Sequence, residues 1–135
     1  MTVKDAILDG LRYDQWANDL WDKTLLEWSN PRANETRGHM TNAKRIWLER
    51  MTGEPHDVRE IELDARYIAF VLESDLTHEL EYRNLRGDTF RQPLHQILRH
   101  VVFHGQYHRG QLRALAEEDG IAWPETDMIA FFRAV

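Results

Sequence analysis

Two histidines have the spacing of ligands for a metal ion. His104 and His108 are four residues apart, so on a helix that turns about 100° per residue they project from one face. Both lie within roughly 20° of the apolar stripe of Ile97, Val101 and Leu115. Two imidazoles that point at an apolar core need partners for their ring nitrogens, and one divalent ion between them is such a partner.

A third ligand has to come from another segment, and His39 is the best candidate. It shares a helical face with Ala43, Ile46 and Trp47, so we expect it to point inward as well. Three neutral imidazoles leave a divalent ion its full charge and an open coordination position, which is typical of a catalytic rather than a closed structural site. Imidazole suits several transition metals, and we expect zinc or nickel.

Packing without a metal is the competing explanation. A lone inward histidine such as His39 is more often a hydrogen-bonded core residue than a ligand. The spacing of His104 and His108 is also common in helices. His100 lies about 60° from the stripe, so we expect it either to support a ligand from outside the metal site or to line a pocket wall. The other histidines are expected in loops or at the surface without a role: His56, His78 and His95.

No carboxylate is placed clearly enough to serve as a catalytic acid or base. Asp14 and Glu49 are candidates from the first and second helices. Charged residues on such helices are more often solvated than functional. Catalytic and cofactor-binding residues therefore stay unassigned.

Three residues beside the histidine pair have interpretable positions. Gln111 is about one turn from His108 and is either a hydrogen-bond partner that orients the ring or a surface amide. Arg109 points about 100° away from the metal face, so we expect an ion pair with an acidic residue on a neighbouring helix or subunit. Gly110 has no side chain and allows another group to approach closely.

The elements that position these residues are mostly helices. Apolar residues recur at intervals of three and four, and Pro and Gly punctuate the pattern. The expected helices span residues 3–28, 34–51, 60–76 and 93–119, and a short last helix begins near residue 124 and covers one end of a bundle. Residues 81–90 alternate around a Gly-Asp pair, which predicts a small hairpin or an extended crossover.

Composition limits the classes of function. The 135 residues are enough for one domain, which we assign to residues 1–135. No apolar run approaches the roughly 20 residues of a membrane span, and the start lacks a secretory signal, so we expect a cytoplasmic protein without a membrane partner. The net charge of −6 disfavours nucleic acid as a partner. The chain has no cysteine, so thiol chemistry requires a small-molecule thiol.

Several motifs resemble those of the DinB-like (DinB/YfiT) family. Residues 100–112 closely resemble its H-x-x-x-H-x-x-x-H-R-G-Q signature, and residues 13–18 are similar to its Y-x-x-W-A-N pattern. His39 with residues 45–48 looks like the histidine motif of its second helix. Residues 120–128 resemble its G…P-x-T-D ending. The resemblance covers nearly the whole chain, although the third helical region is shorter than the family pattern.

The resemblance implies an all-α, up-down-down-up four-helix bundle with a metal held by His39, His104 and His108, often in a homodimer. Family members include S-transferases and isomerases that use low-molecular-weight thiols such as bacillithiol or mycothiol. It therefore favours a metal-dependent enzyme with a small-molecule substrate and a thiol cofactor. A metal-dependent hydrolase, a non-enzymatic metal- or ligand-binding stress protein and a metal-free helical interaction domain are the alternatives.

Overall fold

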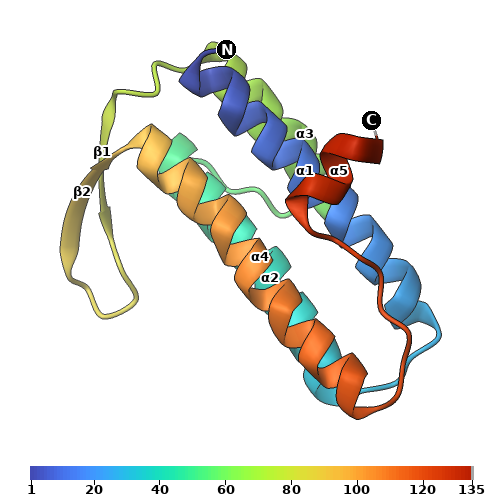
Figure 1. Ribbon diagram of the computed structural model, residues 1–135. Helices are drawn as coiled ribbons and strands as arrows, with labels where there is room; N and C mark the ends of the chain where they lie inside the picture. The colour runs from blue at the N-terminus through green and yellow to red at the C-terminus, as the bar shows by residue number, and fades with distance from the viewer. Residues whose placement is uncertain (135) are drawn as a thin grey trace.

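Helices make up most of the structure, which is a computed structural model that describes residues 1–134 (Figure 1). Four of the helices are long or intermediate in length, and a two-stranded sheet precedes the last of these four. The elements are α1 (Val3–Leu26), α2 (Pro31–Thr52), α3 (Glu60–Glu73), β1 (Glu79–Arg83), β2 (Thr89–Pro93), α4 (Leu94–Glu118) and α5 (Met128–Ala134). Helices α1 and α2 each pack against both α3 and α4. No helix within residues 1–134 has both the length and the apolar character that a membrane crossing needs.

The first two helices begin at capping residues. The Thr2 side chain accepts a hydrogen bond from the Asp5 backbone and the Asp5 side chain accepts one from the Thr2 backbone, which forms a capping box. Asn30 caps α2, and Pro31 occupies its first turn, where a missing N–H costs nothing. The sequence prediction used Pro31 only as the end of α1 and therefore began the second helix three residues late. Gly53 ends α2 with φ 70°, a conformation that favours glycine.

The predicted hairpin is confirmed. Strands β1 and β2 are antiparallel, with Tyr82 opposite Phe90, and Gly87 in the connecting turn has φ 87°. Helix α3 ends at Glu73, three residues before the predicted boundary, because the chain turns there towards the hairpin. The backbone of Leu94 donates to the His78 carbonyl at 2.9 Å, which fixes the hairpin to the start of α4.

The last helix lies elsewhere than predicted. Instead of covering an end of the helices, α5 packs against α1. The Phe131 ring lies 5.9 Å from the Tyr13 ring and 5.5 Å from the Trp16 ring, which places it beside the middle of α1. The segment that leads to α5 is held by the Trp21 indole, whose Nε1 donates to Thr126 Oγ1 at 3.1 Å. Because the Phe131 ring packs against these aromatic residues, α5 lies along the side of α1 and not at the end of the helices.

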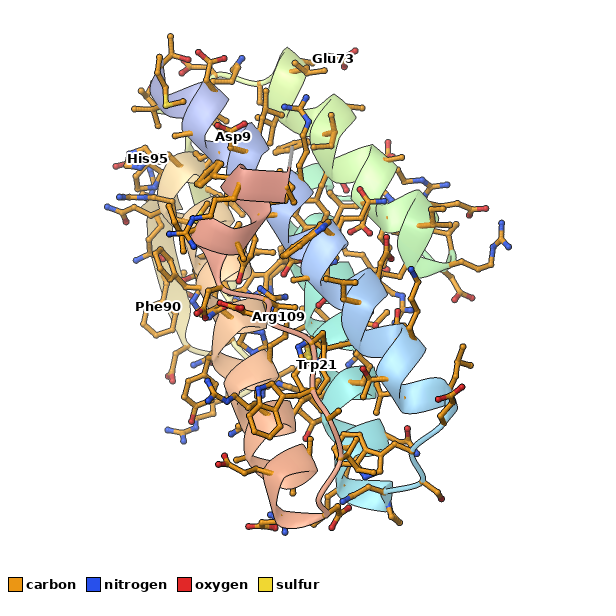
Figure 2. The ribbon with its side chains drawn as sticks, turned by 45° about the vertical axis from the view of Figure 1, so that its right-hand side comes forward. Asp9, Trp21, Glu73, Phe90, His95 and Arg109 are labelled. Atoms are coloured by element: carbon orange, nitrogen blue, oxygen red, sulfur yellow. The ribbon has the colours of Figure 1, made fainter. Side chains whose placement is uncertain are left out.

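Two of the three apolar clusters of residues 1–134 fill the space between the longer helices, and the third joins α1 to Phe131 of α5. One contains Leu11, Leu48 and Val101. The second contains Trp21, Met40 and Leu112 and lies further towards the other end of α1 and α4. Figure 2 shows Trp21 and Arg109 within the packed helices. Between the two clusters along α1, α2 and α4 lie buried polar residues, namely Asp14, Asn18, Lys44 and Arg109.

Candidate metal centre

The three predicted ligands lie together between α2 and α4. His39 comes from α2 and the other two from α4, and one ring nitrogen of each lies within 4.8 Å of the others. The Nε2 atoms of His104 and His108 are 3.1 Å apart. Two nitrogens about 2.1 Å from one tetrahedral ion lie roughly 3.4 Å apart, so the pair fits a shared divalent ion with little movement. The structure thus brings together the residues that the sequence predicted.

The cluster faces solvent rather than the core, which corrects the predicted direction. His39 is exposed, and His104 and His108 are only partly buried. The prediction assumed that only apolar residues of the second helix point inward. In the structure the buried face of α2 also contains Arg37 and Lys44, and His39 lies on its exposed side, next to His104 and His108 of α4.

A hydrogen bond to His108 and a lowered pKa of His104 suit these two rings to act as metal ligands. The Gln111 side-chain carbonyl accepts a hydrogen bond from His108 Nδ1 at 2.7 Å, which leaves the Nε2 lone pair directed at the cluster. Of the two roles considered for Gln111, the structure therefore shows the hydrogen bond that the orienting role requires. Burial lowers the pKa of His104, and the neighbouring His108, His39 and His100 act in the same direction, so that the pKa falls to about 4. His104 is therefore neutral at pH 7, as a ligand must be.

His100 lies in a pocket wall, as predicted. Its ring centre is 5.7 Å from that of His104 and 5.5 Å from that of Trp47. It lines a recess of about 150 Å³ that also includes Tyr82 and Gln92 from the hairpin. The recess begins beside the histidine cluster, so it is a suitable place for the body of a bound small molecule.

For His56 the predicted loop position is confirmed. It lies in the connection between α2 and α3 but is buried, with Nε2 2.7 Å from the Thr52 hydroxyl and Nδ1 2.8 Å from Arg66. These partners explain its burial without a functional role. His78 is exposed, as predicted. Glu49 accepts a hydrogen bond from the His56 backbone at 2.8 Å and is not part of the metal cluster.

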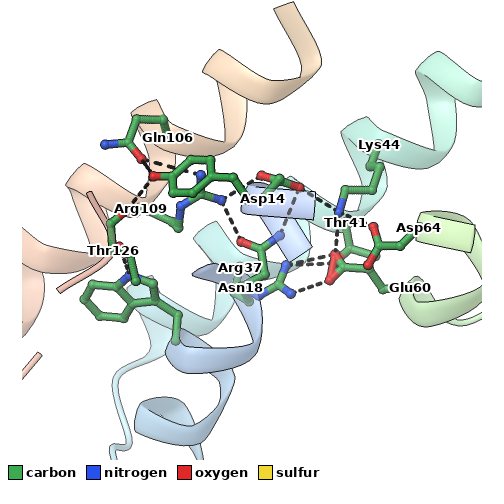
Figure 3. Close-up of polar contacts among 12 residues, drawn as sticks. Asp14, Asn18, Arg37, Thr41, Lys44, Glu60, Asp64, Gln106, Arg109 and Thr126 are labelled. Carbon is green, nitrogen blue, oxygen red and sulfur yellow. Dashed lines mark hydrogen bonds and ion pairs between the residues drawn. The ribbon is translucent and has the colours of Figure 1, made fainter. Parts of the chain in front are cut away.

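A buried ion network lies beside the cluster, and Asp14 is at its centre (Figure 3). Asp14 Oδ1 accepts from Arg109 Nη1 at 2.7 Å, which confirms the predicted ion pair of Arg109 with a neighbouring helix. Asp14 Oδ2 lies 2.9 Å from Lys44 Nζ, and Lys44 also donates to Asp64 at 2.8 Å. The expectation that Asp14 is solvated is wrong, because cations from two other helices compensate its charge.

Arg37 is a further cation of this network and also contacts α3. Arg37 Nε donates to Asp22 at 2.8 Å, and its guanidinium also pairs with Glu60. Sequence reasoning missed Arg37, Lys44, Glu60 and Asp64. The available signal was the position of Arg37 and Lys44 at helical spacing on the same face as the small and apolar residues of α2.

Burial and the neighbouring charges together determine the pKa values of Asp14, Asp64 and Lys44. Burial alone raises the pKa of Asp14, but Lys44 and Arg109 outweigh burial, and the pKa falls below its ordinary value. Burial also acts on Asp64 and there exceeds the effect of Lys44, so its pKa rises to about 6. Lys44 keeps its proton because the surrounding carboxylates raise its pKa despite burial.

One glycine makes this arrangement possible. A Cβ on Gly105 would lie 2.3 Å from Asp14 Oδ1 and 3.0 Å from Arg109 Nη1. The prediction assigned close approach to Gly110, but nothing lies within 4 Å of a Cβ built there. Gly105 therefore has the role expected of Gly110, because it is the glycine of α4 that faces α1.

Comparison with known proteins identifies the family. The model of the DinB family matches residues 62–134, which include His104 and His108. Protein DinB of Bacillus subtilis (strain 168) is 32% identical over 80 residues, which cover 55% of this chain and 46% of that protein. The chain thus spans about half the length of this curated relative. No solved structure matches it significantly. Because the family model covers more than half of the sequence, the chain belongs to the DinB family.

Proposed function

We propose that the chain holds one divalent metal ion, zinc or nickel, through His39, His104 and His108 and acts as a metal-dependent enzyme. The observation that carries the proposal is the convergence of three ring nitrogens within 4.8 Å at a partly solvent-exposed position between α2 and α4. Gln111 directs one lone pair to the cluster, and the exposure of His39 leaves a side open for a small molecule.

The reaction that we favour is transfer of a low-molecular-weight thiol to a small electrophilic substrate. When bound, the ion lowers the pKa of a coordinating thiol or water towards neutrality. The chain itself has no cysteine, so the sulfur has to come from a cofactor. Within residues 1–134 no carboxylate joins the histidine group, which favours a nucleophile that needs no carboxylate base.

Metal analysis tests the site. Protein purified without an affinity tag is expected to contain about one divalent ion per chain, and His39→Ala, His104→Ala and His108→Ala are expected to lose it and to melt at lower temperature. His95→Ala is the matched control, because His95 is also on α4 but lies outside the cluster. A wild-type protein without metal, whose melting temperature ignores added zinc, nickel and chelator, contradicts the proposal.

A panel of small thiols tests the reaction. We expect conjugation of a chromogenic electrophile with at least one thiol, dependent on metal and abolished in His104→Ala. Turnover of esters or amides without any thiol favours a hydrolase instead. Metal binding without turnover in either assay favours the non-enzymatic binding protein.

The finer architecture is also a proposal. We infer that residues 1–135 form one domain in which α1 to α4 make the up-down-down-up bundle of the family; Val135 lies outside the described residues. The packing of α1 and α2 against both other helices supports this inference. The homodimer stays a prediction, and exposed apolar residues of α4, such as Phe103 at 69% exposure, suit such an interface. Light scattering of wild type and Phe103→Glu distinguishes dimer from monomer.

A further inference from the structure

A small cavity connects the buried ion network to the histidine cluster. It measures about 10 Å³ and is lined by Asp14, Lys44, Ala43, Gly105 and His104, with further apolar walls. A volume of about 10–15 Å³ measured for a water-sized probe accommodates one water molecule. A water also needs two to four polar partners, and this cavity is lined by charged groups as well as by an imidazole.

The His104 side chain lines this cavity, and the cluster uses only one of its two ring nitrogens. Its Nε2 lies 3.1 Å from His108 Nε2 and belongs to the cluster. Nδ1 therefore remains for a partner outside the cluster. Ligand imidazoles normally donate their second N–H to a carboxylate, a carbonyl or a water, which fixes the orientation of the ring and raises its basicity.

Asp14 and Lys44 each have capacity for one more hydrogen bond. The Asp14 carboxylate has about four acceptor positions, and Arg109, Lys44 and Asn18 use three of them. The Lys44 ammonium has three donors, of which Asp14 at 2.9 Å and Asp64 at 2.8 Å take two, whereas Glu60 at 3.6 Å is too distant for a good hydrogen bond.

Gly105 allows the Asp14 carboxylate to lie close to His104. It directly follows His104, and the Asp14 carboxylate lies against it where any other residue would have a Cβ. The carboxylate thereby reaches the backbone of α4 next to the ligand. Charge complementarity alone does not require this approach, because Arg109 could reach an aspartate further away with its long side chain.

We propose that Asp14 is a positioning residue of the metal centre, which holds the His104 ring through one water bound between Asp14, Lys44 and His104 Nδ1. The inference rests on the proposed metal site. The water accepts from Lys44 and from His104 Nδ1–H and donates to Asp14. Asp14 thus orients His104 much as Gln111 orients His108, but through a buried link instead of a surface one.

Two substitutions test the link by zinc affinity. Asp14→Asn removes the anion, and we expect the zinc Kd to rise roughly 10- to 100-fold. Asp22→Asn is its matched control, since Asp22 is on the same helix and pairs with Arg37 but does not line the cavity. Ala43→Val fills the cavity without altering any charge and is expected to weaken zinc similarly, whereas Asn42→Val on the exposed side is not.

A measurement on the unaltered protein covers the case in which the variants fail to fold. A high-resolution crystal structure of wild type, with or without zinc, is expected to contain one water within hydrogen-bond distance of both Asp14 and His104 Nδ1. A dry cavity overturns the inference, as do wild-type zinc affinities in both Asp14→Asn and Ala43→Val. Failure of wild type to bind any metal overturns the proposed function and this inference together.

Discussion

Replacement of Lys44 by methionine is the most direct test of the buried ion network. The Lys44 side chain is 6% exposed, with Asp14 and Asp64 within 2.9 Å of its Nζ. Methionine has a similar length but leaves these carboxylates without the shared cation. Removing one partner of a buried ion pair typically costs 3–5 kcal/mol, because the remaining charge is buried and uncompensated.

The cost for Lys44→Met is expected at the lower end of that range, about 3 kcal/mol. Asp14 keeps its hydrogen bond from Arg109 at 2.7 Å, and Asp64, with a pKa of about 6, can take up a proton instead of staying charged. Addition of Asp64→Asn to Lys44→Met is expected to recover part of the loss, because one uncompensated charge disappears.

Urea unfolding at pH 7, followed by circular dichroism, measures this difference. Lys23→Met is the control, because Lys23 is exposed on α1, and a change within about 0.5 kcal/mol is expected there. If Lys44→Met unfolds within 1 kcal/mol of wild type, roughly the effect of an exposed ion pair, then the network does not compensate buried charge and the reasoning is refuted.

Three further predictions follow from neighbouring contacts. Gly105→Ala is expected to destabilise the fold by about 1–3 kcal/mol in urea unfolding, since its Cβ would overlap Asp14, and an unchanged midpoint contradicts this. Because burial raises the pKa of Asp64 to about 6, the folded state binds its proton more tightly than the unfolded state, and this residue's contribution to stability increases as pH falls from about 6 to about 4. Asp64→Asn should remove that increase from the pH dependence of unfolding, and an identical profile opposes the assignment. Gln111→Leu is expected to raise the zinc Kd roughly tenfold in a chelator competition assay by freeing the His108 ring, and an unaltered Kd argues against its orienting role.

Local periodicity was sufficient to predict much of the metal centre. The pairing of His104 and His108 depends only on the repeat of one helix, and the contact of His108 with Gln111 depends on the same repeat. The hairpin was likewise predictable from a turn signal between alternating segments. These features need no information about the rest of the fold, because residues three or four apart on a helix are neighbours wherever the helix lies.

The tertiary structure alone decided which polar residues are buried. His39 was predicted as a ligand from its helical face, but its exposure, and the burial of Lys44 and Asp14, depend on which helices meet. A lysine or an aspartate is costly in a core unless opposite charges from other helices reach it, and a pattern within one helix contains no information about those partners. For the same reason Gly105 could not be distinguished from Gly110, since only the packed helices determine which glycine faces a carboxylate.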